Sequence, residues 1–239
     1  MSNNDNNDDN IIKIPSLAER DKIRRKKLKE ENPNEPFINL PSYTKIIIAT
    51  LFTIHIIGIA LNYISPLWYD MIFFHLAFTP ASWSGNTNFL TTSIITPITH
   101  MLIHAGWIHI CSNLLMTTIF ATITERWIGG KNMIKMFLIG GICGSLTHLA
   151  VEPTSIIPLV GASGGISSLF ACSALMMFRK GMLGKANGIK HPLAIFLGIW
   201  IVISLIFGVI TPEGTSIAWA AHLGGMFGGL AYARFVMKL

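Results

Sequence analysis

The sequence predicts an all-α polytopic membrane protein: a bundle of six transmembrane helices with a half-immersed outer loop between helices 1 and 2. The first observation behind this prediction is the composition. Of the 239 residues, 51% are hydrophobic and 13% are charged, and the mean hydropathy is +0.53. A soluble domain carries about a quarter of its residues as Asp, Glu, Lys and Arg. The composition therefore excludes a soluble enzyme, a disordered protein and a secreted disulfide scaffold.

The second observation is the spacing of the charges, which leaves long uncharged runs such as the one between Asp70 and Glu125. A hydrocarbon core about 30 Å thick needs about 20 apolar helical residues to cross it. Helices are expected because a lone strand would leave backbone groups unpaired in lipid. The six expected spans are residues 46–64, 107–124, 133–151, 157–178, 192–210 and 214–236.

The third observation is the distribution of basic residues, which orients the bundle. Lys and Arg occur in the N-terminal tail, in the second and fourth connections and at the C-terminus. The only charged residues of the alternate connections are acidic, namely Asp70, Glu152 and Glu213. Under the positive-inside rule, both termini are therefore expected in the cytoplasm.

The chain is expected to divide into a tail, residues 1–44, and a membrane domain, residues 45–239. Eight of the 18 basic residues lie between Lys13 and Lys29, interleaved with acidic ones. This pattern is typical of a solvated, largely disordered cytoplasmic tail beside a membrane. The net charge of +6 therefore points to a lipid surface and not to a nucleic acid partner.

The outer loop comprises residues 71–106, which are uncharged but too polar and too long for a tight turn. Pro80 and Gly85 interrupt it, and Trp68 and Trp83 are residues that favour a membrane interface. We expect irregular backbone here, half-immersed and covered by protein.

Three polar groups stand out in the apolar runs. Ser163 lies in the segment Gly-Ala-Ser-Gly-Gly of the fourth span, and His222 lies in Ala-His-Leu-Gly-Gly of the sixth. The third group, at the outer end of the second span, consists of His100, His104, His109 and Asn113. The expected topology brings a nucleophile, a base and an amide donor to one depth. The helix N-terminus near Ser163 also favours a developing oxyanion.

Each group also has a packing interpretation. Gly161 and Gly165 form a small-residue motif for helix association, and a single intramembrane histidine can be structural. An α/β-hydrolase elbow is disfavoured because it needs a preceding strand and an acid before the histidine. A zinc protease is disfavoured because no H-E-x-x-H segment is present. Neither a metal nor an organic cofactor is expected.

Together these segments resemble the motifs of the rhomboid family of intramembrane serine proteases. The motifs stand in family order on the expected second, fourth and sixth helices, and the resemblance covers nearly all of the chain after the tail. It implies a six-helix rhomboid-like bundle in which Ser163 is the nucleophile and His222 is the base. It also implies that Asn113 and His109 line the oxyanion hole.

The sequence departs from the family pattern at two places. Ile95 and Thr96 stand where many bacterial members have a Trp-Arg pair. Ser167 stands where the family usually has an aromatic ring that stacks on the catalytic histidine. One helical turn below the nucleophile, Ser167 is expected to point toward His222, and a ring introduced there is expected to raise the cleavage rate or leave it unchanged.

The expected function is an intramembrane serine endopeptidase with a Ser163–His222 dyad, since the sixth span carries no carboxylate. His100 and His104, with Ser167 in support, are expected to supply a polar route for water. Single-span or polytopic membrane proteins, cut near the outer face, are the expected substrates, and the bacterial inner membrane is the expected location. The alternative is a weak or inactive rhomboid-like protein that binds or escorts membrane helices. A small transporter would show broken helices in paired halves, which are not found.

Overall fold

The computed structural model describes residue 19, residues 39–182, residues 191–210 and residues 218–237. Within these residues every regular element is a helix, apart from one isolated antiparallel bridge between Phe78 and Leu159. The expected all-α fold is therefore confirmed for the described part of the chain. Nearly all of the expected tail and parts of two connections lie outside the described residues.

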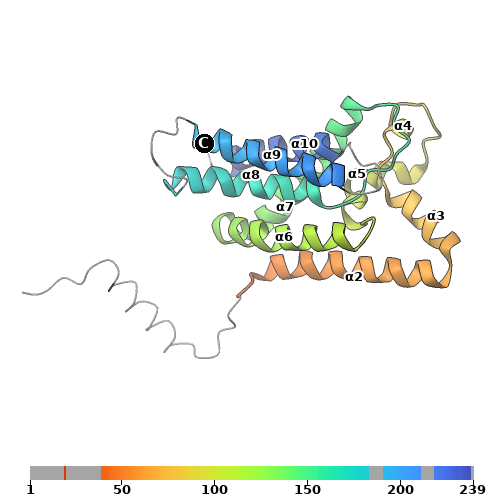
Figure 1. The fold of residues 1–239 in the computed structure, drawn as a ribbon, viewed down its shortest axis with the longest axis horizontal. Helices are drawn as coiled ribbons and strands as arrows, with labels where there is room; N and C mark the ends of the chain where they lie inside the picture. The colour runs from red at the N-terminus through yellow and green to blue at the C-terminus, as the bar shows by residue number, and fades with distance from the viewer. Residues whose placement is uncertain (1–18, 20–38, 183–190, 211–217, 238–239) are drawn as a thin grey trace, which may run out of the picture. The chain divides into compact units, whose positions relative to one another are not determined.

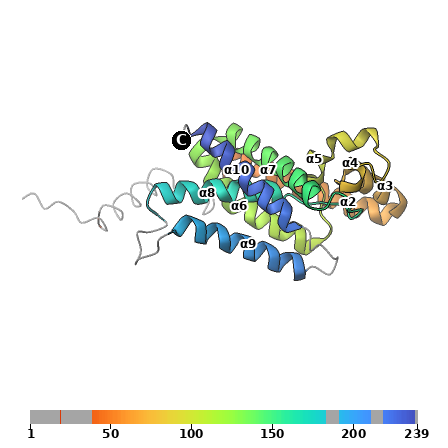
Figure 2. The ribbon, with the colours of Figure 1, turned by 90° about the horizontal axis from the view of Figure 1, so that it is seen from above.

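Six of the described helices have 17 to 23 residues and correspond to the six expected spans. They are α2 (Ser42–Ile64), α6 (Trp107–Ile128), α7 (Gly130–Val151), α8 (Ser163–Arg179), α9 (Pro192–Ile210) and α10 (Ala218–Val236). Among the described helices, α2, α6 and α7 are long and apolar enough to cross a membrane. Figure 1 shows α2 and α6 side by side, and Figure 2 shows α9 along another edge of the bundle, next to α8.

The expected start of the fourth span at residue 157 is wrong, because α8 begins at Ser163. The backbone before it is extended: Leu159 N–H donates to the Phe78 carbonyl at 2.8 Å, and Phe78 N–H donates to the Leu159 carbonyl at 3.1 Å. Gly161 then turns the chain at φ +107°, a region that residues with a Cβ rarely adopt. An apolar run alone does not distinguish this extended segment from helix. Residues 214–217 of the expected sixth span lie outside the described residues.

The outer segment between α2 and α6 is a series of short helices. It contains α3 (Pro66–Leu76), α4 (Pro80–Trp83), η1 (Thr91–Ile95), α5 (Thr96–Thr99) and η2 (His100–Leu102). The expectation of irregular backbone is wrong for residues 71–76, which continue α3. That helix starts favourably, with proline at its first position and the Ser65 hydroxyl accepting from Trp68 N–H.

The helices α7, α8 and α10 pack with their backbones in contact. A Cβ added to Gly225 of α10 would collide with the carbonyl oxygen of Gly164 of α8, and one added to Gly144 of α7 would lie 2.8 Å from the Ala221 carbonyl oxygen. Small residues permit such close approach between helices in a membrane. The glycine-rich segments therefore have the packing role that the sequence predicts. They also flank the polar residues singled out above.

The helix α2 is attached at its N-terminus by an acidic side chain of α6. Glu125 accepts hydrogen bonds from Tyr43 N–H at 3.1 Å, from Thr44 N–H at 2.7 Å and from the Thr44 hydroxyl at 2.8 Å. The first N–H groups of a helix have no partner within the helix, and a negative charge beside them also suits the helix dipole. A single carboxylate thus satisfies two such groups and orients α2 against α6.

Candidate active site

Ser163 is the first residue of α8 and is half-buried. Its backbone N–H belongs to the first turn, where amides have no acceptor within the helix. The preceding Gly161, with its positive φ, lets the chain pass abruptly from an extended segment into α8. The local sequence therefore places the Ser163 hydroxyl beside the N–H groups of the first turn of α8, which have no acceptor within the helix.

Three histidines of residues 100–109 surround this turn. The His100 carbonyl accepts from Gly161 N–H at 2.8 Å, and His104 Nε2 accepts from Ala162 N–H at 3.4 Å. The His109 ring faces Gly161 so closely that a Cβ on that glycine would lie 2.5 Å from His109 Nε2. The histidine-rich segment thus contacts the turn directly before Ser163. The contacts include a backbone carbonyl and two histidine rings.

His222 lies on the face of α10 that meets α8. This assignment follows from Gly225, one turn further along, whose backbone contacts Gly164. His222 therefore stands at the level of the turn that precedes α8. Within the described residues, both of its ring nitrogens are buried and have no hydrogen-bond partner.

Asn113 is buried on α6, one turn after His109, and its Nδ2 donates to the His109 carbonyl at 2.8 Å. The same carbonyl accepts from the Ser112 hydroxyl at 2.9 Å. An asparagine amide carries two N–H donors, so the bond to His109 leaves one of them for another acceptor. Asn113 and His109 are thus fixed to each other.

Ser167 does not have the surroundings that we expected from the sequence. It is fully buried on α8, and its hydroxyl accepts from the indole N–H of Trp200 on α9 at 3.0 Å. The Trp200 ring stacks on Phe170, with centroids 4.4 Å apart, and Phe170 stacks on Phe196 at 5.1 Å. The Ser167 hydroxyl therefore joins α8 to α9, whereas we expected it to face His222.

Two residues near these groups were missed by the sequence reasoning. Trp200 is one, and no local pattern indicates which helix its indole meets. The other is His55 of α2, whose ring lies 6.4 Å from that of His104 and 5.1 Å from that of Trp107, measured between centroids. A signal for His55 was available, because any ionisable residue inside an apolar run is a candidate for function.

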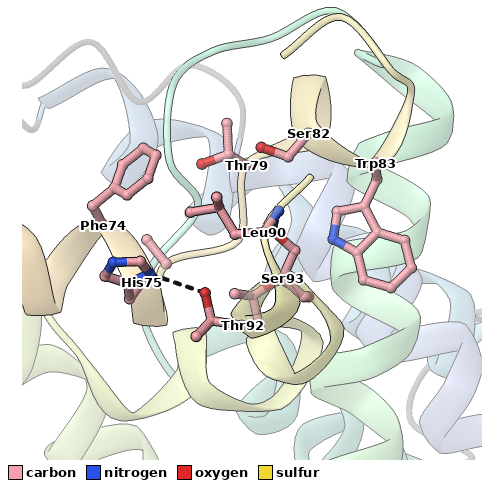
Figure 3. A pocket seen from close by; sticks show the side chains of 10 residues that line it. Phe74, His75, Thr79, Ser82, Trp83, Leu90, Thr92 and Ser93 are labelled. Atoms are coloured by element: carbon pink, nitrogen blue, oxygen red, sulfur yellow. Dashed lines mark hydrogen bonds between the residues drawn. The ribbon is translucent and has the colours of Figure 1, made fainter. Parts of the chain in front are cut away.

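A separate pocket lies in the outer segment (Figure 3). Phe74, His75, Thr79, Ser82, Trp83, Leu90, Thr92 and Ser93 line it, together with Ala77 and Thr96. His75 Nδ1 and the Thr92 hydroxyl form a hydrogen bond of 2.9 Å across its edge. None of the expected catalytic or oxyanion residues lines this pocket. In the described part of the chain, no group of three or more His, Cys, Asp and Glu side chains is arranged to hold a metal ion.

Comparison with known proteins places these features in a family. The rhomboid domain model matches residues 91–239, which is more than half of the chain. Rhomboid-related protein 2 of Mus musculus is 33% identical over 59% of this chain and 47% of its own length. The rhomboid-family protein YdcA of Bacillus subtilis is 31% identical over 57% of this chain and 62% of its own. Rhomboid protease GluP of Bacillus subtilis is 28% identical over 57% of this chain and 24% of its own.

The matched part thus spans less than two thirds of each of these relatives. The match nevertheless includes the turn at Ser163, the helix that carries His222 and the segment with Asn113. The long apolar helices of the described residues are consistent with this match to the rhomboid domain. The chain is an integral membrane protein that belongs to the rhomboid family.

Proposed function

We propose that the protein is an intramembrane serine endopeptidase that uses Ser163 as nucleophile and His222 as base. One observation carries the proposal: α8 begins with a serine beside first-turn N–H groups, and His222 lies on α10 one turn before Gly225, whose backbone meets Gly164 next to that serine. Relatives that are named rhomboid proteases support the same reaction class.

In the proposed mechanism, Ser163 Oγ attacks the carbonyl carbon of a peptide bond while His222 takes its proton. The tetrahedral oxyanion accepts hydrogen bonds from the Ser163 N–H, the second Asn113 N–H and the His109 ring. His222 then gives the proton to the leaving amine, and a water molecule hydrolyses the acyl-enzyme with His222 again as base. Because the residues of α10 include no Asp or Glu, the catalytic pair is a dyad.

The proposed substrates are single-span or polytopic membrane proteins. A fully helical segment holds its carbonyls in hydrogen bonds, so segments that unwind readily are preferred. In the proposed topology, both termini are cytoplasmic and the site lies near the outer face of a bacterial inner membrane; the basic residues of the alternate connections support this orientation. His100 and His104, both buried in the last part of the outer segment, contact the turn before α8, and in this proposal they form the polar lining along which water reaches the site.

The test of the dyad compares four purified variants on a model single-span substrate. Ser163→Ala and His222→Ala are expected to lose cleavage completely, whereas Ser42→Ala and His191→Ala, at exposed positions, retain it. A fluorophosphonate probe labels Ser163 in the wild type and nothing in Ser163→Ala. Cleavage by purified Ser163→Ala means that the serine mechanism is wrong. A wild type that binds the substrate but neither cuts it nor reacts with the probe favours the escort function.

The proposed orientation is tested by labelling from outside the cell. In a variant whose three cysteines are replaced by alanine, Thr154→Cys is expected to react with an impermeant thiol reagent in intact cells. Lys131→Cys, in the first turn of α7 and therefore at the other end of that helix, reacts only after the cells are opened. Both positions are exposed. The reverse pattern would put the active site on the cytoplasmic side.

A further inference from the structure

Every Lys and Arg among the described residues lies at one end of the helix bundle, and all seven side chains are exposed. We call this end the cationic end. It comprises the first turn of α2, the last turns of α6 and α10, the first two turns of α7 and the end of α8. The seven residues are Lys45, Arg126, Lys131, Lys135, Arg179, Lys180 and Arg234.

Contacts between the helices show that these five helix ends lie together. The attachment of α2 to α6 is described above, and Gly129 alone separates α6 from α7. Lys180 Nζ lies 4.9 Å from the centroid of the Trp127 ring, which joins the end of α8 to the end of α6. The Tyr232 hydroxyl donates to Asn132 Oδ1 at 3.4 Å, which joins α10 to α7. The positive charges therefore belong to one end of the bundle and not to separate places on it.

Acidic residues of the chain do not offset this charge. Within the described residues from 39 onward, Glu125 is the only acid at the cationic end, and both of its oxygens accept hydrogen bonds from the start of α2. Asp70 and Glu152 follow the C-terminal ends of α2 and α7 and so lie at the opposite end. Even without Arg126, six positive charges stand against this one negative charge.

Two lysines of α7 make this excess of positive charge costly. Lys131 and Lys135 are one turn apart on the same face of α7, and like charges at this spacing repel each other. Lys131 also lies in the first turn of the helix, where the helix dipole disfavours a cation, and that turn contains no acidic residue. The positive-inside rule concerns the side of the membrane on which such residues stay, and it does not remove the repulsion. A negative charge from outside the chain does.

The aromatic residues of the cationic end indicate the depth at which that negative charge is found. Tyr43, Trp127 and Tyr232 are half-buried at this end. Trp and Tyr favour the level of the lipid headgroups, where the ring meets apolar groups and its polar atom meets water. Because Lys180 Nζ lies against the Trp127 ring, its charge is at that level as well. The anion found at that level is the phosphate of a phospholipid.

We propose that the cationic end binds anionic phospholipids through their headgroup phosphates, with Lys131, Lys135 and Lys180 among the contacts. An ammonium group is a compact charge with three donors, which suits a phosphate whose orientation is not fixed. A zwitterionic lipid carries the same phosphate, but its own ammonium group offsets the charge, so anionic lipids are preferred. The interaction does not depend on the proposed protease function.

The test titrates the full chain, purified in detergent micelles, with phosphatidylglycerol or with phosphatidylcholine of the same acyl chains. Bound lipids are counted by native mass spectrometry, and the wild type is expected to prefer phosphatidylglycerol. The double variant Lys131→Gln/Lys135→Gln is expected to bind phosphatidylglycerol roughly five- to 25-fold more weakly, since each Lys near an anionic lipid contributes about five-fold. The matched variant Lys131→Arg/Lys135→Arg keeps both charges and retains wild-type binding.

A second control, Lys26→Gln/Lys27→Gln, removes the same number of charges from the N-terminal tail and is expected to leave binding unchanged. An equal loss in this control overturns the proposal, because net charge alone would then govern binding. A wild type without preference for phosphatidylglycerol also overturns it, and that measurement needs no variant. Displacement of bound phosphatidylglycerol by excess inorganic phosphate would indicate a site for free phosphate instead. None of these measurements uses cleavage, so a failure of the protease function leaves this test intact.

Discussion

The two sides of α8 are joined to their neighbours in different ways. Toward α7 and α10, the helix backbones are in contact, with glycines such as Gly164 and Gly225 at the crossings. Toward α9, the contact consists of large side chains, in which Trp200 stacks on Phe170 and donates to Ser167. The interface of α8 with α7 and α10 requires residues without side chains, whereas its interface with α9 is formed by large side chains. The residues of the proposed dyad lie on the helices of the first interface.

This difference has a physical consequence. Lipid tails are as apolar as the helices, so association in the bilayer depends on close packing and on hydrogen bonds between helices. An added atom between two backbones has no space to occupy, whereas aromatic side chains can be trimmed or shifted by degrees. We therefore expect a substitution between α8 and α10 to cause an all-or-none loss of stability and cleavage. We expect substitutions between α8 and α9 to lower both gradually.

The largest expected effect is that of Gly225→Ala. The new methyl group meets the Gly164 carbonyl oxygen, which the backbone cannot withdraw. Overpacking of this kind costs about 1–3 kcal/mol or more, and it separates α10 from α8. Cleavage is expected to fall to background, and the unfolding midpoint in detergent is expected to fall by several degrees.

The matched control is Gly198→Ala on α9, where an added Cβ meets no heavy atom of the described residues within 4 Å. This change is expected to leave activity unchanged and to stabilise α9 by up to about 1 kcal/mol, since alanine is the better helix former. Equal behaviour of Gly225→Ala and Gly198→Ala would break the comparison.

A smaller loss is expected from Ser167→Phe. From the family resemblance alone, a ring here is expected to help or to be neutral. The structure reverses that expectation, because Ser167 is fully buried against Trp200. The ring displaces the indole and costs about 1–3 kcal/mol. Activity is expected to drop several-fold, as judged by initial cleavage rates. A rate above the wild type, with the fold intact, would mean that the ring turns toward His222.

The smallest effect is expected from Trp200→Phe, which keeps the stacked ring and loses the N–H donor. The loss is about 0.5–1.5 kcal/mol of stability, with cleavage within about three-fold of the wild type. Ser167→Ala leaves the indole N–H buried and unpaired, so it is expected to cost more than Trp200→Phe. The double variant should then be more stable than the sum of the single changes predicts. Strict additivity in thermal unfolding would argue against the hydrogen bond.

The sequence alone was sufficient for the six long helices, because their apolar runs have the length of a helix. It also singled out Ser163 and His222 as candidates, because a nucleophile and a base are expected at one depth on different helices, and their catalytic roles stay a prediction. It failed at residues 157–162, where a bridge to Phe78, about 80 positions earlier, keeps the chain extended. It failed at Ser167 for a similar reason: its partner Trp200 belongs to another helix, and no spacing rule connects them.

His55 was missed although its signal was local. A histidine in an apolar run is visible in the sequence, but its importance depends on which ring it meets, and that ring belongs to a different segment. Sequence patterns thus locate groups that act within their own motif. They do not locate groups that act through a partner far along the chain.

The attachment of α2 to Glu125 also fixes an order of events during synthesis. The N–H groups of Tyr43 and Thr44 find their acceptor 82 and 81 residues later in the chain. At about 5–20 residues per second, that acceptor emerges roughly 4–16 seconds after the helix that needs it. Until then water at the membrane surface must satisfy these amides. The helix α2 is thus inserted early but docked late, and His55 reaches its place only after α6 has been made.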